Sequence, residues 1–375
     1  MPKYSKQKEI ITGLLAMADV VPGRGKPWDI AVHNEAFYGR VLSQGTLGLG
    51  ESYMDGWWDC EKLDEFIYKT VSANLKDRVI LNWTMAKTYL QAKLFNRQNV
   101  QRSREVIEKH YDLSNELYMS FLDPYNQYTC GYFKNTTDLN IAQEQKLKLI
   151  CEKLQLKPTD QVLDIGCGWG GFAKYAAEHY GCHVTGVTIS KEQAKYARDF
   201  TKGLPVTIQE IDYRDLTGSF DKILICGMIE HVGPKNYKKI FSVVHRCLKN
   251  DGLFLLQTIG DKNSRPLADP WIDKYIFPNG ILPALNQLIA AGEKLFITED
   301  LQNFGAYYDP TLMAWFKNFD AHWDTIKNNF DERFYRMWKY YLLSCAGVFR
   351  ARHMQLWHFV FSKKGLIGGY NSIRP

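Results

Sequence analysis

Short apolar runs alternate with amphipathic segments through the central part of the chain, from Pro158 to Ile259. Runs of strand length are followed by segments whose apolar residues recur at helical spacing. This alternation is typical of a parallel sheet whose strands are joined by crossover helices. The predicted strands cover residues 161–167, 183–189, 206–211, 222–227 and 253–259, and the predicted helices cover 171–178, 190–202 and 234–248. We therefore predict a doubly wound α/β domain.

The two ends of the chain show different patterns. An aromatic-rich stretch follows Gly260, and we expect its helices to cover the core of the α/β domain. Helical spacing also dominates the N-terminal region, where a glycine-rich segment at 45–50 is expected to be a connection. Further predicted helices cover 8–20, 63–72, 76–95, 311–329 and 331–354, and a last strand covers 355–362. We predict a smaller, mainly helical domain at 1–100 and the α/β domain at 101–375, with the boundary in the polar run 96–103.

Composition and charge limit the classes of protein that remain. Apolar residues make up 45% and charged residues 23%, as in soluble globular proteins. A net charge of +6 is too small for general nucleic-acid binding but is compatible with an anionic surface. Much of the basic excess lies in 75–109, where Val79, Trp83, Ala86 and Leu90 share one helical face. That face is expected either to dock on a bilayer or to pack on its own domain.

The cysteines and the N-terminus bear on cellular location. The eight cysteines form no Cys-x-x-Cys pair and no Cys/His metal spacing, so we predict neither a metal site nor a disulfide framework. The N-terminus has no apolar signal segment, and no apolar run is long enough to span a membrane. These features favour the reduced cytoplasm.

Three spaced glycines follow the first predicted strand and open the next helix. Gly166, Gly168 and Gly170 therefore lie at the carboxyl edge of the sheet, where a ligand can approach the backbone. A dinucleotide site would instead have Gly-x-Gly-x-x-Gly and an acidic residue after the second strand, so a nicotinamide-dependent oxidoreductase is disfavoured. A tight turn without a ligand is the remaining interpretation of these glycines. Together with Asp164, the string resembles motif I of class I S-adenosylmethionine-dependent methyltransferases.

Further segments narrow this resemblance to one family. They are 128–133 (YTCGYF), 227–234 (GMIEHVGP), 304–309 (FGAYYD), 110–112 (HYD) and 349–352 (FRAR). Over about residues 100–365 the chain is similar to the cyclopropane fatty acid synthases. The resemblance implies that the α/β domain transfers a methylene group from S-adenosylmethionine to the cis double bond of an unsaturated acyl chain. The added N-terminal domain resembles the bacterial branch that acts on membrane phospholipids, and it implies a lipid- or membrane-associated role for 1–100.

The chemistry of this reaction sets its own requirements. An unactivated alkene is a poor nucleophile, so the site must hold it in a dry, apolar pocket against the sulfonium methyl group. Methyl transfer leaves a carbocation, which loses a proton as the ring closes. The site therefore needs charge stabilisation, for example by Tyr or Trp rings, and a base. Aromatic residues are enriched in 270–375, and we expect the acyl pocket there.

The resemblance implies that bicarbonate is the base, held by five residues: Cys130, Glu230, Gln257, Ile259 and Tyr308. The family has histidine where this chain has Gln257. A glutamine amide can donate a hydrogen bond to an anion, but it has no titratable proton and no charge. Our hypothesis is that Gln257 preserves the anion site by hydrogen bonding.

The resemblance also assigns the residues that bind S-adenosylmethionine. They are Tyr128, Thr129, Asp164, Gly166, Cys167, Gly168, Trp169, Gly170, Thr188, Ile189, Ser190, Gln193, Asp212 and Tyr213. It further implies a homodimer that contacts the inner face of the cell membrane peripherally.

Several of these residues have plainer interpretations. Glu230 precedes a helix that begins near Pro234, so its plainer role is to compensate the charge of the helix N-terminus. Tyr308 can be core or rim, and His231 is expected to be structural. Cys345 is either a small buried apolar side chain or part of the catalytic pocket lining. For the whole protein, two further possibilities are a related methyltransferase with a methyl-branched product and a catalytically silent lipid-binding relative.

Overall fold

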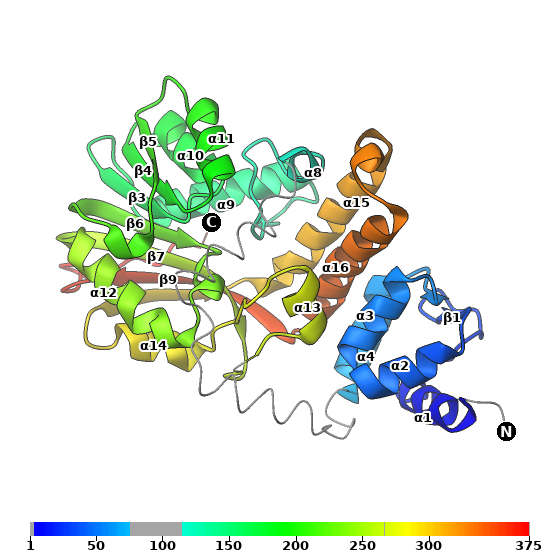
Figure 1. Ribbon diagram of the computed structural model, residues 1–375. Helices are drawn as coiled ribbons and strands as arrows, with labels where there is room; N and C mark the ends of the chain where they lie inside the picture. Colours follow the sequence, from blue (N-terminus) through cyan, green and yellow to red (C-terminus); the bar gives the residue numbers. More distant parts are fainter. Residues whose placement is uncertain (1–3, 76–114, 266, 375) are drawn as a thin grey trace. The chain divides into compact units, whose positions relative to one another are not determined.

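The computed structural model describes residues 4–75, 115–265 and 267–374 (Figure 1). The chain divides into two compact units. The helical unit comprises Met1–Phe95, Pro266–Asn279 and Asp309–Met354, and the α/β unit comprises Asn96–Arg265, Gly280–Tyr308 and Gln355–Pro375. The predicted helix at 76–95, the basic face within 75–109, the motif at 110–112 and the boundary at 96–103 lie outside the described residues. The division into functional domains at 1–100 and 101–375 stays a prediction.

A seven-stranded sheet forms the centre of the α/β unit, in the order β5-β4-β3-β6-β7-β9-β8. Its strands are β3 (Gln161–Ile165), β4 (His183–Thr188), β5 (Val206–Glu210), β6 (Phe220–Cys226), β7 (Leu248–Asp261), β8 (Ile297–Asn303) and β9 (Met354–Ser362). Strands β3 to β7 pair in parallel, whereas β8 and β9 pair antiparallel. The doubly wound α/β prediction is confirmed. The edge strand β8 was not predicted, because its sequence, ITEDLQN, is largely polar and exposed.

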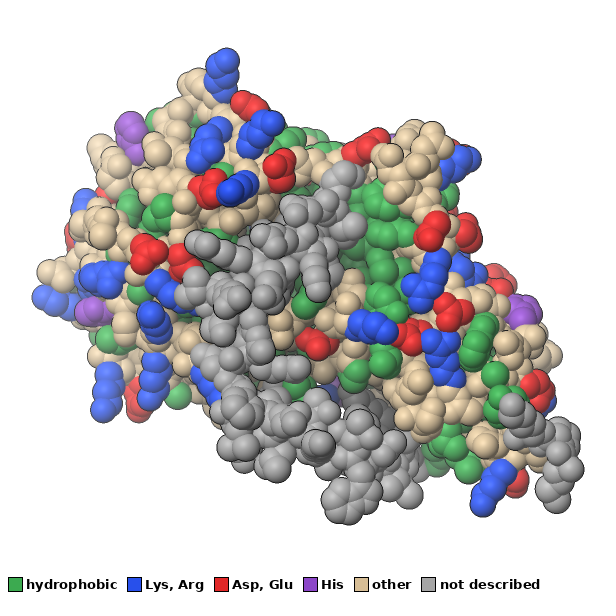
Figure 2. Space-filling model, in the orientation of Figure 1, with side chains coloured by type: hydrophobic (Ala, Val, Ile, Leu, Met, Phe, Trp, Pro, Cys, Tyr) green, Lys and Arg blue, Asp and Glu red, His purple; other side chains and the backbone are tan. Residues whose placement is uncertain are grey.

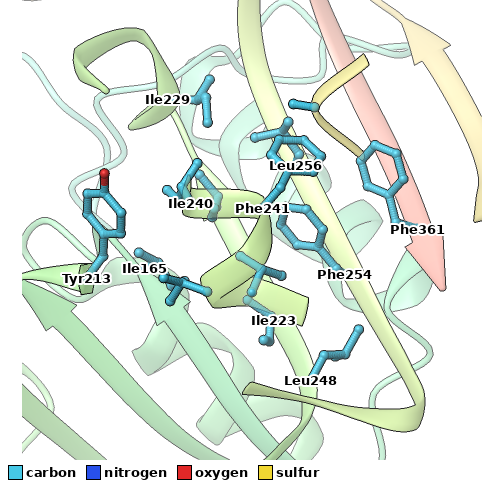
Figure 3. Packing of buried hydrophobic residues seen from close by; sticks show 14 of the residues in the cluster. Ile165, Tyr213, Ile223, Ile229, Ile240, Phe241, Leu248, Phe254, Leu256 and Phe361 are labelled. Atoms are coloured by element: carbon cyan, nitrogen blue, oxygen red, sulfur yellow. The ribbon is translucent and has the colours of Figure 1, made fainter. Parts of the chain in front are cut away.

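Helices pack on both faces of this sheet. They are α9 (Leu139–Lys153), α10 (Gly171–Tyr180), α11 (Lys191–Phe200), α12 (Tyr237–Cys247) and α14 (Leu285–Gly292), and the short helix α8 (Asn115–Met119) precedes them in the chain. On one face, α12 and α14 share a core with alternate strand residues, and Figure 3 shows Phe241, Phe254 and Phe361 meeting there. On the other face, α9 and α10 pack on the intervening residues, such as Leu224 and Leu255. Because side chains alternate along a strand, two apolar faces make the central strands, such as β6, nearly continuous apolar runs.

The helical unit contains α1 to α4 and three later helices. Its elements are α1 (Ser5–Ala16), β1 (Ala31–Val32), α2 (Ala36–Gln44), α3 (Thr46–Met54), β2 (Trp58–Asp59), α4 (Leu63–Ser72), α13 (Pro270–Tyr275), α15 (Tyr308–Ile326, from Asp309 onward) and α16 (Glu332–Arg350). The predicted C-terminal helices are confirmed as α15 and α16. Their rings form a cluster that includes Phe319, Trp323, Tyr335 and Trp338.

The predicted connection at 45–50 is wrong for 46–50, because helix α3 begins at Thr46 and Gly45 alone joins it to α2. Gly45 makes the turn with a φ of 60°, whereas Gly48 and Gly50 are required for close packing. A Cβ atom at Gly48 would collide with the backbone carbonyl of Arg40, and one at Gly50 would overlap the indole ring of Trp271. Glycines that allow two elements to approach closely look the same in a sequence as glycines that break a helix.

Arg350 joins α16 to two neighbouring helices of the same unit. Its guanidinium lies 2.7 Å from Asp64 and 3.1 Å from Glu65 on α4, and it binds both carboxylate oxygens of Asp309 at 2.9 and 3.0 Å. We expect Arg350→Ala to lower the free energy of unfolding by about 2 kcal/mol, because three partly buried carboxylates lose their partner.

The matched control for Arg350 is Arg333→Ala on the same helix. Arg333 is more exposed and forms its ion pair with Asp55 at 3.0 Å. Exposed pairs contribute about 1 kcal/mol or less, so this variant should unfold nearly as the parent does. Urea titration of both variants measures the difference, and equal losses would contradict a special role for the Arg350 network.

Charge is mixed on the face of the molecule that Figure 2 draws. Lys and Arg side chains are interspersed there with Asp and Glu side chains.

None of the helices in the described ranges combines the length and apolar character that crossing a bilayer requires. In the same ranges, no group of three or more His, Cys, Asp or Glu side chains is arranged to hold a metal ion.

Candidate functional site

The glycine loop after β3 has the geometry that a close ligand requires. Gly166, Gly168 and Gly170 have φ of 83°, 54° and 83°, a region that other residues rarely adopt. The backbone amides of Gly166 and Cys167 donate to the Val187 carbonyl at 2.8 and 3.0 Å, which fixes the loop to β4. Among the described residues, no atom lies within 4 Å of where a Cβ of Gly168 would be, so the backbone is open to approach there.

Predicted cofactor contacts meet at the end of β4. The Thr188 hydroxyl donates to Gln193 Oε1 at 3.2 Å, and Ser190 caps α11 by accepting from the Gln193 amide at 3.3 Å. All three side chains are buried, while Ile189 lies between them in the turn. A bound ligand would find hydroxyl and amide groups already positioned by hydrogen bonds.

The turn after β5 contains two other predicted cofactor contacts, and their side chains have different surroundings. Asp212 accepts from the Arg214 amide at 2.9 Å and forms an ion pair with the Arg214 guanidinium at 2.7 Å. The Tyr213 ring instead packs into the hydrophobic core seen in Figure 3. Asp212 therefore remains the polar group of this turn, and the Tyr213 side chain supports the fold.

Aromatic rings from α8 link two predicted cofactor residues. The Tyr118 ring lies 4.8 Å from Trp169 and 5.1 Å from Tyr128 between ring centroids. The Trp169 indole donates to Asn115 Oδ1 at 2.9 Å. Neither Tyr118 nor Asn115 was predicted from the sequence, because α8 is too short to give a clear helical pattern.

A buried lysine lies beside the predicted residues Thr129 and Asp164. Lys146, on α9, donates to the Thr129 hydroxyl at 3.0 Å and to the Gln127 side chain. Burial lowers the pKa of Lys146. Burial also raises the pKa of Asp164 to about 7, against the lowering effect of the Lys146 charge. Lys146 was not predicted from the sequence. A sign of its burial there is that it lies four residues before the apolar Ile150, which places the two on one face of a helix.

Glu230 is held in a dry position by the backbone of β7. It lies in the short helix η2 (Ile229–His231), and its Oε1 accepts from the Ile259 amide at 2.8 Å. Its Oε2 is buried and has no hydrogen-bond partner among the described residues. Burial raises the pKa of Glu230 to about 7, despite its backbone hydrogen bonds. The carboxyl group therefore bonds β7 instead of capping the N-terminus of α12, and a substantial fraction is protonated near neutral pH.

Gln257 lies opposite Cys226 in the β6–β7 register and is almost fully buried. Its Oε1 lies 2.6 Å from Nε2 of His358 on β9. His358 was not singled out from the sequence, because the contact joins residues far apart in the chain and no local pattern marks it. Burial lowers the pKa of His358 well below its usual value, so the imidazole is neutral.

Aromatic contacts bring the remaining predicted residues toward this pair. The Phe304 ring meets His358 edge-on at 4.6 Å and Tyr132 at 5.6 Å. Tyr307 meets Tyr132 at 5.2 Å. The predicted residues Cys130 and Tyr308 are both buried in these two segments. Ring contacts thus link the segments 128–133 and 304–308 to His358 on β9, which in turn is hydrogen-bonded to Gln257 on β7.

Cys345 lies on α16 of the helical unit, and it is half-buried. Burial, with a smaller effect of Asp269, raises the pKa of its thiol to about 12. A protonated thiol is a weak nucleophile, so no covalent role is expected.

We predict that Cys345→Ala keeps kcat within about twofold of the parent and that thiol reagents react with Cys345 slowly at neutral pH. A large loss of kcat with an unchanged unfolding midpoint would show that the sulfur takes part in the reaction.

Comparison with known proteins gives consistent matches. The model of the mycolic acid cyclopropane synthetase family matches residues 98–359. The cyclopropane-fatty-acyl-phospholipid synthase of Escherichia coli K12 is 52% identical over 354 residues, which are 94% of this chain and 93% of that protein. The tuberculostearic acid methyltransferase UfaA1 of Mycobacterium tuberculosis is 31% identical over 353 residues, 88% of this chain and 82% of that protein.

A solved structure has a fold similar to that of most of this chain. The crystal structure of the mycolic acid cyclopropane synthase CmaA1, complexed with SAH and CTAB, has a TM-score of 0.65 and 30% sequence identity. The match covers 70% of this chain and 98% of that chain.

Proposed function

Because the chain belongs to the mycolic acid cyclopropane synthetase family, we propose that it transfers a methylene group from S-adenosylmethionine to the cis double bond of an unsaturated phospholipid acyl chain. The product is a cyclopropane acyl chain. The observation that carries this proposal is the 52% identity to the E. coli phospholipid enzyme over 94% of this chain, which includes residues of both units.

S-adenosylmethionine supplies an electrophilic methyl group when it is bound. The open backbone at Gly168, the hydroxyl of Thr188 and the amide of Gln193 fit its amino-acid and ribose groups. The half-buried Thr129 and the buried Lys146 and Asp164 place further polar groups at the same end of the sheet. These residues bind and orient the cofactor, and the surrounding rings of Tyr118, Tyr128 and Trp169 exclude water.

Bicarbonate is the proposed base that takes the proton released at ring closure. Glu230 supports this part of the proposal, since its Oε2, unpartnered among the described residues, can carry a proton at neutral pH and donate it in a hydrogen bond to an anion. The remaining donors would come from the segments that contain Cys130 and Tyr308, and from Gln257. The Ile259 amide already binds Glu230, so in this chain Ile259 positions the carboxyl group.

The proposed substrate places the enzyme at a membrane surface. We propose peripheral contact with the inner face of the cell membrane and a homodimeric assembly, in keeping with the family resemblance. The net charge of +6 favours binding to anionic headgroups.

A direct assay tests the proposed function. Purified protein is incubated with S-adenosylmethionine labelled in the methyl group and with vesicles of unsaturated phospholipid, with and without added bicarbonate. We expect label in the lipid, a gain of one CH₂ in mass, loss of the reducible double bond and cyclopropane proton resonances. Absence of label in lipid under every condition would favour a silent lipid-binding protein.

The second candidate is a methyltransferase with a methyl-branched product. The 31% identity to a tuberculostearic acid methyltransferase favours this candidate over a silent lipid-binding protein. The same assay separates the two enzymatic candidates, because a branched chain shows no ring-proton resonances.

A further inference from the structure

The side chains of Gln257 and His358 form a buried pair between β7 and β9. The atoms Gln257 Oε1 and His358 Nε2 are 2.6 Å apart, and neither residue is more than 1% exposed. Among the described residues this is the only hydrogen bond of the His358 ring, since its Nδ1 is buried without a partner. The hydrogen bond offsets the cost of burying the two polar side chains, whereas the Nδ1 atom stays without a described partner.

The protonation of the ring follows from these contacts. Burial and the nearby positive charges of Lys153, Lys146 and Arg374 keep the imidazole neutral, so it carries one N–H. If that hydrogen were on Nδ1, a buried donor would have no partner among the described residues, which is rarer in proteins than an unpartnered acceptor. The hydrogen therefore lies on Nε2 and is donated to Gln257 Oε1.

This bond decides which end of the glutamine amide is available. An isolated amide can present either its oxygen or its NH₂ group to a neighbour. With Oε1 occupied by the imidazole, the NH₂ group is the part of Gln257 that remains to donate. We propose that His358 is a positioning residue, which fixes the Gln257 amide so that its NH₂ group donates to the anion held by Glu230.

The proposal rests on the proposed bicarbonate site, and it explains how a chain without a histidine at position 257 can retain that site. Gln257 and Ile259 lie two residues apart on β7, and the backbone amide of Ile259 donates to Glu230 Oε1 at 2.8 Å. The amide of Gln257 and the carboxyl of Glu230 are thus anchored to neighbouring positions of one strand. The imidazole at this site belongs to His358 on the adjacent strand β9, whereas the family has a histidine at position 257 on β7.

The test uses the full chain and three variants. His358→Phe removes the donor and keeps a ring against Phe304. The double variant Gln257→His with His358→Gln exchanges the two groups and keeps one amide and one imidazole in contact. The matched control is His183→Phe, at the exposed start of β4. The measurements are kcat and the KM for bicarbonate in CO₂-depleted buffer, with binding of S-adenosylhomocysteine and the unfolding midpoint as checks on folding.

We expect His358→Phe to raise the KM for bicarbonate by about tenfold, the effect of one lost hydrogen bond, while S-adenosylhomocysteine binding changes little. The exchanged pair should recover most of the loss, and His183→Phe should match the parent. If the parent depends on bicarbonate and folded His358→Phe has the parental KM, the role of His358 is overturned but the proposed base stands. If lipid is modified and the parent shows no dependence on bicarbonate, the proposed base fails and this inference fails with it.

Discussion

We expect Glu230→Ala to lower kcat by about a hundredfold or more, which is the effect of removing a donor that stabilises an anion in a dry site. The substitution removes both functions of the carboxyl group, the acceptor for the Ile259 amide and the buried Oε2, which no described residue bonds. The loss is expected in turnover and in the KM for bicarbonate. S-adenosylhomocysteine affinity and the unfolding midpoint serve as controls for the fold.

Glu230→Gln is the matched variant for this prediction. A glutamine amide keeps an acceptor for the Ile259 amide and places an NH₂ group where the protonated Oε2 would be. We therefore expect its kcat to stay within about tenfold of the parent. If Glu230→Gln is as inactive as Glu230→Ala, the ionised carboxylate is the form that is needed, and the assignment of a protonated acid is wrong.

The raised pKa of Glu230 also predicts a pH dependence. The carboxyl group is mainly protonated below about pH 7, and it ionises as the pH rises through that value. An ionised carboxylate repels a second anion, so the affinity for bicarbonate should fall above pH 7 when the bicarbonate concentration is held constant. Glu230→Gln cannot ionise, and its KM for bicarbonate should not show this step.

The alternation of strands and helices was sufficient to predict the α/β unit, because both faces of its sheet are covered. A strand such as β6 is then apolar on both sides and stands out in the sequence. The same reasoning failed for β8, whose exposed edge position allows charged residues. It also failed for α3, where Gly48 and Gly50 serve close packing. Burial on one side only, and glycine used for contact, leave weak or misleading patterns.

Candidate site residues could be predicted where a local motif marks them. The glycines after β3 occupy closely spaced backbone positions, so their pattern is visible in the sequence. Lys146 and His358 were missed because their importance depends on contacts with Thr129 and Gln257, which lie far away in the chain. Such pairs are set by the order of the strands and the docking of helices, which no single segment encodes.

Gly168→Ala should abolish most cofactor binding while leaving the protein folded. An added methyl group at Gly168 meets no atom of the described residues within 4 Å, so it would occupy the space that a ligand needs to approach the loop. Displacing a reacting group by about 1 Å can cost about a hundredfold in rate, and we expect a loss of that order in kcat/KM for S-adenosylmethionine. Binding of S-adenosylhomocysteine, measured by calorimetry, should weaken in parallel.

Gly203→Ala separates this effect from backbone strain. Gly203 also has a positive φ, of 86°, and open space around its Cβ position, but it lies beyond the end of α11. Both substitutions should cost about 1 kcal/mol of stability, because alanine is strained in this conformation. Only Gly168→Ala should lose cofactor affinity. Equal losses in the two variants would mean that strain, and not contact with the cofactor, explains the glycine at position 168.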